Sequence, residues 1–506
     1  MSEQAQARTA LAMSTLAFTL CFAVWTLNGV LVTFLVENGV FHWDTGQVGW
    51  LIGIPVLTGS LMRLPVGLLT DRFGGRTVYS LLLLLSAIPT WLLGSVTTYQ
   101  GFLLGSLGFG LSGAAFAVGI AYSSVWFSKE RQGTALGIFG AGNAGSALTS
   151  MGAPLLLKHF SAGGANLEGW RMLPRLYAVL LVGMALAFYL LTHERRVASA
   201  KGKRLGELLS PLRHVRVWRF GLYYFLVFGC FVALAQWLIP YYVGVYGMSL
   251  AMAGLLAALF SLPSGLIRAA GGWMSDRFGA RTVMYWTFGL SLVACVALMV
   301  PRMTIESPGP AVLAQAGGRV QEVGPGRVVV NGTAYALREK APEAEFENER
   351  VMVLPQSRFW QVPAVKVGDT VKKKQLLATG VTHVFFQANV WIFTFLVFLL
   401  GIVWGIGKAA VYRYIPDYFP EQVGVVGGIV GVIGGLGGFA GPILFGYMLK
   451  STGLWTTMWV FLALLSGVCL VWLHTVVRRI TREQDQTLFT RFEQPSLPPV
   501  GLTEPA

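Results

Sequence analysis

The sequence predicts an all-α polytopic membrane protein with twelve transmembrane helices in two six-helix halves, and a small β-rich extracytoplasmic insertion. Hydrophobic residues make up 54% of the 506 residues and charged residues only 12%, whereas a soluble domain carries about 25% charge. Apolar stretches of about 20 residues, enough to span a bilayer about 30 Å thick, recur along most of the chain. One 16-residue block also occurs twice, 205 positions apart, which indicates two homologous halves.

The apolar stretches place the twelve predicted spans, and aromatic residues lie near many of their ends, as expected at a membrane interface. The first stretch follows a short polar tail and is too long for a signal peptide. The predicted spans are residues 11–36, 46–70, 77–97, 101–127, 132–156, 172–192, 218–246, 250–274, 282–301, 385–412, 423–449 and 454–477.

These spans divide the chain into two halves and three connecting or terminal segments. We expect an N-terminal six-helix half (1–195), a basic cytoplasmic linker (196–217), a C-terminal six-helix half (218–301 and 385–477), a β-rich insert (302–384) and a cytoplasmic tail (478–506).

The formal charge of +15 predicts topology and not a nucleic-acid partner, because the basic residues lie in particular loops. The excess of Lys and Arg in cytoplasmic loops then places both termini in the cytoplasm, in a multi-pass protein of the bacterial inner membrane. The four cysteines lie within apolar stretches, so we expect packed thiols without disulfides. The basic residues concentrate between spans six and seven and after span twelve: Arg195, Arg196, Lys201, Lys203, Arg204, Arg213, Arg216, Arg219, Arg478, Arg479 and Arg482.

Residues 302–384 interrupt the helical pattern with short alternating runs separated by Gly and Pro, which predicts β-hairpins on the outer side of the membrane. The run VKVGDTVKKKQLLATG resembles a hairpin of lipoyl- or biotinyl-type domains. The lysine turn that carries the prosthetic group in those domains has no match here, so we expect the shape without a cofactor. A plain surface insertion and a docking or sensing module both remain open.

Each copy of the repeated block begins with an arginine inside an apolar stretch, at Arg63 and at Arg268. Each arginine lies eight residues before an aspartate, Asp71 or Asp276, which corresponds to about 12 Å along a helix. With the aspartates near the inner surface, both guanidinium groups are expected near the membrane midplane. An ionised side chain at that depth costs about 3 kcal/mol or more and usually serves a function.

No Asp or Glu lies in the interior of any apolar stretch to neutralise these arginines. The alternative, a pair of arginines balanced by buried acids, is therefore disfavoured, and an anionic substrate is the natural counter-ion. Guanidinium offers a planar fork of donors that suits planar oxyanions. The sequence therefore predicts a transporter for a small anion.

The block GLLTDRFGGR resembles the loop signature of the major facilitator superfamily, and the resemblance extends over all twelve spans. It implies the fold and a conformational role, and it says nothing about the substrate. The residues that carry it are Gly67, Asp71, Arg72, Gly74 and Arg76, and they recur as Gly272, Asp276, Arg277, Gly279 and Arg281.

Spans four, five and eleven resemble the nitrate/nitrite porter family through FAVGIAYSSVWFSKERQGTALGIFGAGNAGSA and GVVGGIVGVIGGLGGFAGP. On that resemblance Arg63 and Arg268 match the two anion-binding arginines and Asn143 matches an amide at the site. Tyr224, Phe228 and Phe116 match its aromatic residues, although ordinary packing remains the simpler interpretation of Phe116 and Phe228 taken alone.

Span ten, GIVWGIGKAAVYRYIPDYFP, resembles the proton-coupled branch of that family. Lys408 is expected about one turn above the inner edge, where desolvation and like charges disfavour its charged form. It is the best candidate for a proton site, with Tyr224 second. The alternative is that Lys408 extends to the inner surface and has no role in coupling.

We therefore expect a monomeric secondary transporter that imports nitrate with protons, by alternating access, without metal or cofactor. A nitrate/nitrite antiporter is the alternative within this class. An anion sensor that signals through the outer insert is the alternative from another class. An enzyme is disfavoured, because the sequence has no metal-ligand cluster, nucleophile elbow or phosphate-binding loop.

Overall fold

The computed structural model describes residues 2–195, 210–300, 303–340, 356–386, 388–419 and 423–493. Each of the twelve predicted spans overlaps a helical segment of these ranges, although span 385–412 begins in strand β7 and its helix starts only at Val390. The N-terminal part, residues 2–195, contains α1 (Glu3–Trp25), α2 (Leu27–Glu37), α3 (Thr45–Leu61), α4 (Arg63–Phe73), α5 (Gly75–Leu93), α6 (Tyr99–Phe109), η1 (Gly110–Ala114), α7 (Ala115–Ser124), α8 (Lys129–Gly140), η2 (Ala141–Ala144), α9 (Gly145–Phe160), η3 (Ala162–Gly164), η4 (Leu167–Arg171) and α10 (Met172–Leu191).

The C-terminal part, residues 210–493, adds a second set of helices and the inserted strands. Its helices are η5 (Ser210–Arg213), α12 (Val215–Tyr224), the π-helical η6 (Phe225–Cys230), α13 (Phe231–Tyr246), α14 (Leu250–Leu266), α15 (Arg268–Phe278), α16 (Ala280–Ala297), α18 (Val390–Tyr418), α19 (Val423–Thr452) and α20 (Thr457–Glu493).

By length and composition, 10 helical segments among the described residues are able to cross a membrane. The number rises to 11 if α14 and α15, which meet at a 51° bend, count as one span. The predicted stretch 132–156 is helical as α8, η2 and α9 but is not among these segments. The polytopic helical fold is thus observed, and the exact count of twelve spans stays a prediction.

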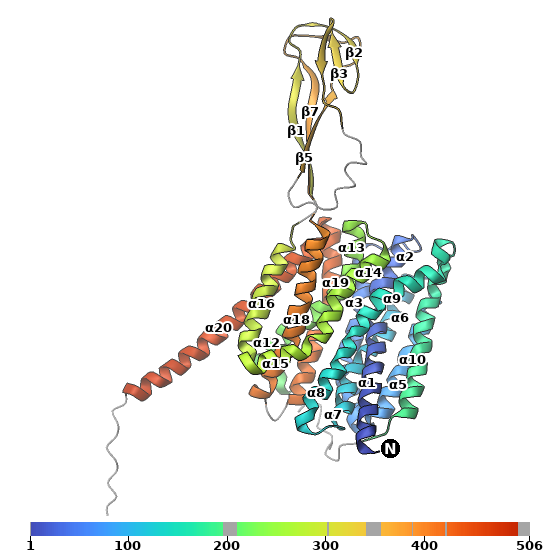
Figure 1. Cartoon of the computed structure of the whole chain (residues 1–506), viewed down its shortest axis with the longest axis vertical. Helices are drawn as coiled ribbons and strands as arrows, with labels where there is room; N and C mark the ends of the chain where they lie inside the picture. Colours follow the sequence, from blue (N-terminus) through green and yellow to red (C-terminus); the bar gives the residue numbers. More distant parts are fainter. Residues whose placement is uncertain are drawn as a thin grey trace, which may run out of the picture.

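The helices form an elongated bundle, and the strands stand away from it at one end (Figure 1). We call that end the insert face. The N-terminus and α15, which carries the second copy of the repeated block, lie at the opposite end, which we call the signature face (Figure 1).

The predicted β-rich insert forms two small antiparallel sheets. One has the order β1-β7-β5 and the other β4-β3-β2-β6. In the first, β1 and β7 pair from Met303↔Phe386 outward, so both ends of the insert meet at the bundle. Strand β7 continues two residues past the predicted boundary at 384. The strands are β1 (Met303–Leu313), β2 (Gly318–Val323), β3 (Arg327–Val330), β4 (Thr333–Ala336), β5 (Gln356–Pro363), β6 (Thr370–Val371) and β7 (Leu376–Phe386).

The two copies of the repeated block adopt the same backbone geometry. A single residue interrupts the helix before each arginine, with φ and ψ of −71° and −10° at Met62 and of −69° and −10° at Ile267. The helix that begins at each arginine then ends at a glycine with positive φ, +91° at Gly74 and +83° at Gly279. Only glycine adopts such angles without strain, so the repeated glycines follow directly from the shared turn.

The N-terminal and C-terminal parts pack closely where α3 crosses α19. A Cβ atom on Gly49 would collide with the backbone of Pro442, and one on Gly53 with the backbone of Phe439. Small residues at such crossings let helix backbones approach in an apolar environment. This close contact of α3 with α19 joins the two parts of the molecule.

The same crossing carries polar contacts at the end of the helices. The Lys450 Nζ donates to the Asp44 carboxylate at 3.0 Å, and the Thr45 hydroxyl donates to the Gly446 carbonyl at 3.1 Å. Among the described residues, Asp44–Lys450 is the one ion pair that joins the N-terminal to the C-terminal part.

Candidate functional site

Arg63 and Arg268 lie at equivalent positions, each as the first residue after a helix break. Arg63 begins α4 and is 5% exposed, while Arg268 begins α15 and is half-buried. The Arg63 Nε and the Arg268 Nη1 are buried and make no hydrogen bond among the described residues. Both guanidiniums therefore retain donors that can bind an anion.

Both arginines approach the ring of Phe116. The Arg63 Cζ is 5.4 Å from the centre of the Phe116 ring, and the Arg268 Cζ is 5.7 Å from it. A guanidinium within about 6 Å of an aromatic ring gains cation–π attraction. Two positive charges this close to one ring also repel each other. An anion between the two cations would relieve this repulsion.

None of the ion pairs formed by the described residues includes Arg63 or Arg268. This agrees with the absence of acidic residues from the predicted spans. A buried charge without a partner is costly. The pair is thus arranged as a site for an anion that comes from outside the chain.

Arg63 also connects the two parts of the molecule. Its Nη1 donates to the Gly431 carbonyl of α19 at 2.8 Å, and its Cζ lies 5.2 Å from the Phe228 ring of η6. On its own side, Arg63 faces the Trp25 ring at 5.7 Å. Movement of α19 or η6 relative to α4 must therefore change the surroundings of this guanidinium.

Tyr224 and Phe228 form one aromatic wall of the site. Their rings stack at a centroid distance of 4.9 Å and an interplanar angle of 10°. Tyr412 meets Tyr224 edge-on at 4.9 Å, and its ring lies 5.8 Å from the Arg268 Cζ. The Tyr412 hydroxyl donates to the Gly427 carbonyl of α19 at 3.0 Å. Flat walls of this kind suit a flat ligand.

Sequence reasoning missed Tyr412 and Trp25 as members of the site. A signal was available for Tyr412, which follows Lys408 by four residues and therefore lies on the same helix face. Trp25 offered none, because its contact with Arg63 depends on how α1 packs against α4.

Several candidate residues lie at irregular turns of their helices. Phe116 follows the 3-10 turn η1, Asn143 lies within the 3-10 turn η2, and Phe228 lies in the π-helical η6. Mid-helix 3-10 and π segments often mark functional sites. Together with the breaks before Arg63 and Arg268, five separate irregularities surround one region of the interface.

Asn143 is fully buried, and neither its amide nitrogen nor its amide oxygen makes a hydrogen bond among the described residues. It packs beside Gly265 of α14, and Gly140, about one turn earlier, is the neighbour of the Arg268 side chain. An unsatisfied buried amide costs about 1–3 kcal/mol. Near Arg268, it is a candidate donor to an oxyanion.

Lys408 lies within α18, which extends past the predicted end of span ten at 412. Helix α18 continues ten residues beyond Lys408 to Tyr418, which corresponds to about 15 Å. The side chain is fully buried, with the Nζ 3.0 Å from the Ser264 hydroxyl and 3.1 Å from the centre of the Phe231 ring. In this conformation it does not extend to the inner surface.

Among the described residues, no hydrogen bond joins Lys408 to Arg63, Arg268 or Asn143. Its hydrogen-bond partner Ser264 lies four residues before Arg268 on the same bent helix pair. The structure therefore connects Lys408 to Arg268 through α14.

The second copy of the signature forms a local ion network on the signature face. The Arg413 Nε donates to the Asp276 carboxylate at 2.8 Å, and its Nη1 donates to the Asp417 carboxylate at 2.8 Å. This network links α15 to α18 within the C-terminal part. It lies away from Arg63 and Arg268, in agreement with a conformational role.

The helical architecture resembles solved transporter structures. A crystal structure of a bacterial homologue of the human lysosomal transporter Spinster, in an inward-facing and occupied conformation, matches with a TM-score of 0.63 at 14% identity, covering 92% of this chain and 96% of that one. The nucleoside transporter NupG matches with a TM-score of 0.56 at 14% identity, covering 92% and 98%. These likenesses show the fold.

Curated relatives are more similar in sequence. The probable nitrate/nitrite antiporter NarK1 of Thermus thermophilus is 40% identical over 95% of this chain and 94% of its own length. The nitrite extrusion protein of Bacillus subtilis is 29% identical, over 65% and 78%. The probable nitrate/nitrite transporter NarK2 of Mycobacterium tuberculosis H37Rv is 31% identical, over 55% and 70%.

The family model of the Major Facilitator Superfamily matches residues 13–334 and 375–500. The gap between the two matched ranges lies within the insert and contains strands β5 and β6. The chain is thus a multi-pass transporter of the major facilitator superfamily and belongs, within it, to the nitrate/nitrite transporter family.

Proposed function

We propose that the protein imports nitrate across the bacterial inner membrane by proton symport, through alternating access of one site to the two sides. The termini and the signature face lie in the cytoplasm, and the insert lies outside. The protein works as a monomer, in which two six-helix halves move about the interface that contains Arg63 and Arg268.

The observation that carries the proposal is the pair of guanidiniums that both lie within about 6 Å of the Phe116 ring, with no acidic partner among the described residues. Arg63 and Arg268 bind the nitrate oxygens through charge-assisted hydrogen bonds. Asn143 supplies a further donor, and Tyr224, Phe228 and Phe116 hold the plane of the ion. The names of the relatives, which refer to nitrate and nitrite, support this choice of anion.

Alternating access follows from the position of these contacts. Arg63 of the N-terminal part is bonded to Gly431 of the C-terminal part. Without an anion, mutual repulsion of the guanidiniums opposes closure of the interface around them. A bound nitrate favours the closed arrangement, which links occupancy to movement through differential affinity for the two states.

Proton coupling is assigned to Lys408. An inward-negative potential opposes entry of an anion by about 2.3 kcal/mol per charge per 100 mV. Co-transport of protons offsets this cost. Lys408 is enclosed and close enough to Arg268 to sense its charge, so neutralisation of Arg268 by nitrate favours protonation of Lys408, and release of nitrate favours loss of that proton.

Nitrate/nitrite exchange is the second candidate, because the most extensively matching relative described above bears the name of an antiporter. In that mechanism the unpaired arginines prevent return of the empty protein, and Lys408 needs no change of protonation. The two mechanisms share the site and differ in the source of energy.

The deciding experiment uses the full chain in proteoliposomes. Symport predicts nitrate uptake that is driven by an inside-alkaline pH gradient into vesicles without internal nitrite. Exchange predicts uptake only into nitrite-loaded vesicles, with no effect of the pH gradient. Failure of uptake under both conditions would remove nitrate as the substrate.

A further inference from the structure

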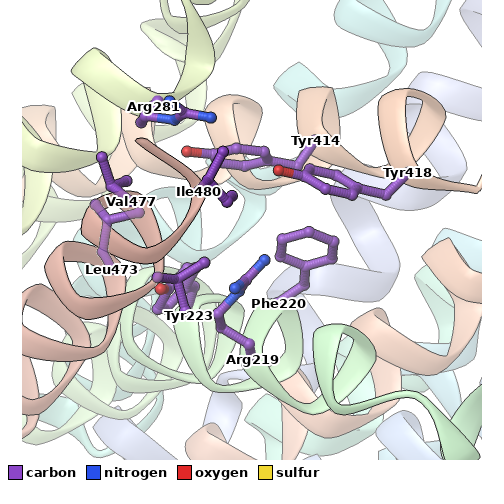
Figure 2. Close-up of a pocket in the computed structure, with 10 residues that line it drawn as sticks. Arg219, Phe220, Tyr223, Arg281, Tyr414, Tyr418, Leu473, Val477 and Ile480 are labelled. Atoms are coloured by element: carbon purple, nitrogen blue, oxygen red, sulfur yellow. The ribbon is translucent and has the colours of Figure 1, made fainter. Parts of the chain in front are cut away.

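Two arginines and three tyrosines line a small niche on the signature-face side of the C-terminal part, away from Arg63 and Arg268. The niche lies between α12, α16, α18 and α20 (Figure 2). Arg219 and Arg281 supply its charge, and Tyr223, Tyr414 and Tyr418 supply its hydroxyls. We infer that this niche binds the phosphate group of an anionic phospholipid or another phosphate-bearing anion of the same charge.

The first argument is the burial of unpaired polar groups. Arg219 is 7% exposed, and its Nε makes no hydrogen bond among the described residues. The hydroxyls of Tyr223 and Tyr414 are also buried without a partner. A desolvated guanidinium beside two unsatisfied hydroxyls is costly unless a ligand completes it.

The second argument is the convergence of these groups from different helices. In Figure 2, Arg281 lies on one side of the Tyr414 and Tyr418 rings, and Arg219 and Tyr223 lie on the other. Phe220 stacks on Tyr414 at 5.4 Å and supports the guanidinium of Arg219 at 5.3 Å. Arg219 is thus held by packing, and Arg281 is exposed, but both are carried by helices and not by loops.

The third argument is the charge around the niche. The neighbouring acids on α15 and α18, Asp276 and Asp417, are both bonded to Arg413. No ion pair of the described residues includes Arg219 or Arg281. Arg216 adds a further positive charge, 5.1 Å from the Tyr418 ring. The field at the niche is therefore uncompensated and favours an anion.

The fourth argument is the shape of the niche and its surroundings. Its atom-free space is about 250 Å³, which includes space open to the surroundings, and the niche itself has room for about one water molecule. We therefore expect the phosphate group at the mouth of the niche, within reach of the exposed Arg281, with the buried Arg219 adding its charge from the opposite side of the tyrosine rings.

An apolar groove along α16 and α20, two of the four helices of the niche, lies next to it. Its atom-free space is about 1180 Å³, and it is lined by side chains that include Leu292, Val296 and Val471. Leu473, Val477 and Ile480 of α20 line the niche itself. Basic pockets between helices near the cytoplasmic surface, with apolar flanks, are typical of anionic headgroup sites.

The test measures thermal unfolding of the purified full chain in a neutral detergent, with increasing dioleoylphosphatidylglycerol. Added lipid should raise the midpoint of the wild-type chain. Loss of one charge-assisted contact in Arg281→Gln should raise the half-saturating lipid concentration at least about tenfold. Arg219→Gln should do the same and Arg219→Lys should retain part of the effect, whereas Arg482→Gln, which removes an equal charge farther along α20, should behave as wild type.

Two further additions identify the source of the phosphate. If inorganic phosphate alone stabilises the wild type but not Arg281→Gln, the niche binds a free anion and not a lipid headgroup. Phosphatidylcholine provides the acyl chains without net negative charge and should have little effect. Equal stabilisation of all variants by phosphatidylglycerol, or equal stabilisation by both lipids, would overturn the site. Arg281 is exposed, so its variant should fold even if Arg219→Gln does not.

Discussion

Arg63 and Arg268 face the same aromatic ring from opposite parts of the molecule, with their Cζ atoms 5.4 and 5.7 Å from the centre of Phe116. The two residues are also equivalent in the chain, because each follows a one-residue helix break with nearly identical backbone angles. The repeat therefore produces a convergent pair of cations at the interface, and the proposed function depends on this pair.

Lysine in place of either arginine keeps the positive charge but should not support normal nitrate transport. Arg63→Lys and Arg268→Lys each remove the planar fork of donors, and loss of a charge-assisted hydrogen bond costs about 1.5–3 kcal/mol. We expect nitrate uptake at low substrate concentration to fall about 10- to 100-fold in each variant. Initial rates in proteoliposomes measure this effect. The exposed Arg8→Lys serves as the control, and an equal loss in that variant would argue against a specific site.

Asn143 provides a test of charge at the site. In Asn143→Asp, a carboxylate of nearly the same shape would stand near Arg268 and replace the anion as its partner. Nitrate binding should be lost, while Asn143→Ala should lose about tenfold because only one donor is removed. Isothermal titration with nitrate measures both variants. Unchanged affinity in Asn143→Asp would exclude Asn143 from the site, and the surface variant Asn38→Asp controls for added charge.

Substitution of Lys408 should affect proton coupling but not nitrate binding. In Lys408→Gln we expect nitrate to bind with an affinity near that of the wild type but uptake to lose its response to a pH gradient. Ser264→Ala, which removes the hydrogen-bond acceptor of Lys408, should retain the response with an altered pH profile. A gradient response that persists in Lys408→Gln would assign proton transfer to another group, with Tyr224 the next candidate.

The Asp44–Lys450 pair should stabilise the contact between the N-terminal and C-terminal parts over the whole physiological pH range. The backbone N–H of Gln47 and the ammonium of Lys450 lower the pKa of Asp44 below its ordinary value of 3.8. The stabilisation is therefore fully present above that value and is lost only as the pH falls through the lowered pKa. Asp44→Asn should change transport severalfold at most, because exposed pairs contribute about 0–1 kcal/mol.

The pH dependence of nitrate uptake distinguishes the Asp44–Lys450 pair from the proposed proton-coupling residue Lys408. Between about pH 5 and 8 the profile of Asp44→Asn should parallel that of the wild type, since Asp44 does not titrate there. The exchanged variant Asp44→Lys with Lys450→Asp should recover the rate lost in either single change. A profile altered in shape by Asp44→Asn would contradict this assignment.

The insert should be dispensable for transport. The first and last paired residues of the β1–β7 ladder are Met303 and Phe386, and paired residues in antiparallel strands lie about 4.5–5.5 Å apart. Residues 304–385 can therefore be replaced by Gly-Gly without strain on α16 or α18. Uptake should be retained within about twofold in proteoliposomes. Loss of uptake in a correctly folded deletion variant would favour the anion sensor or a docking role.

Several features of the site were predictable because they depend on sequence alone. The duplicated block places Arg63 and Arg268 at matched depths, and the absence of acids from the apolar stretches follows directly from composition. The alternation of short runs predicted strands in the insert, and two sheets are present there.

Other features were not predictable because they arise from packing between distant segments. The bond from Arg63 to the Gly431 carbonyl joins residues 368 positions apart. The apolar pattern of span ten ends at 412, whereas α18 continues to Tyr418. In this last part of the helix Arg413 forms ion pairs with Asp276 and Asp417. A pattern of hydrophobicity does not record such pairs, so the inner end of the helix was placed too early.

The measurement that tests the central claim most directly is nitrate binding to the double variant Arg63→Gln, Arg268→Gln, compared with each single variant and with wild type. If the two guanidiniums share one ion, each single change should remove nearly all binding and the double change should add little to either, because the effects of residues that bind one ligand are not additive. Independent, additive losses, or binding that survives the double change, would contradict a shared anion site between Arg63 and Arg268.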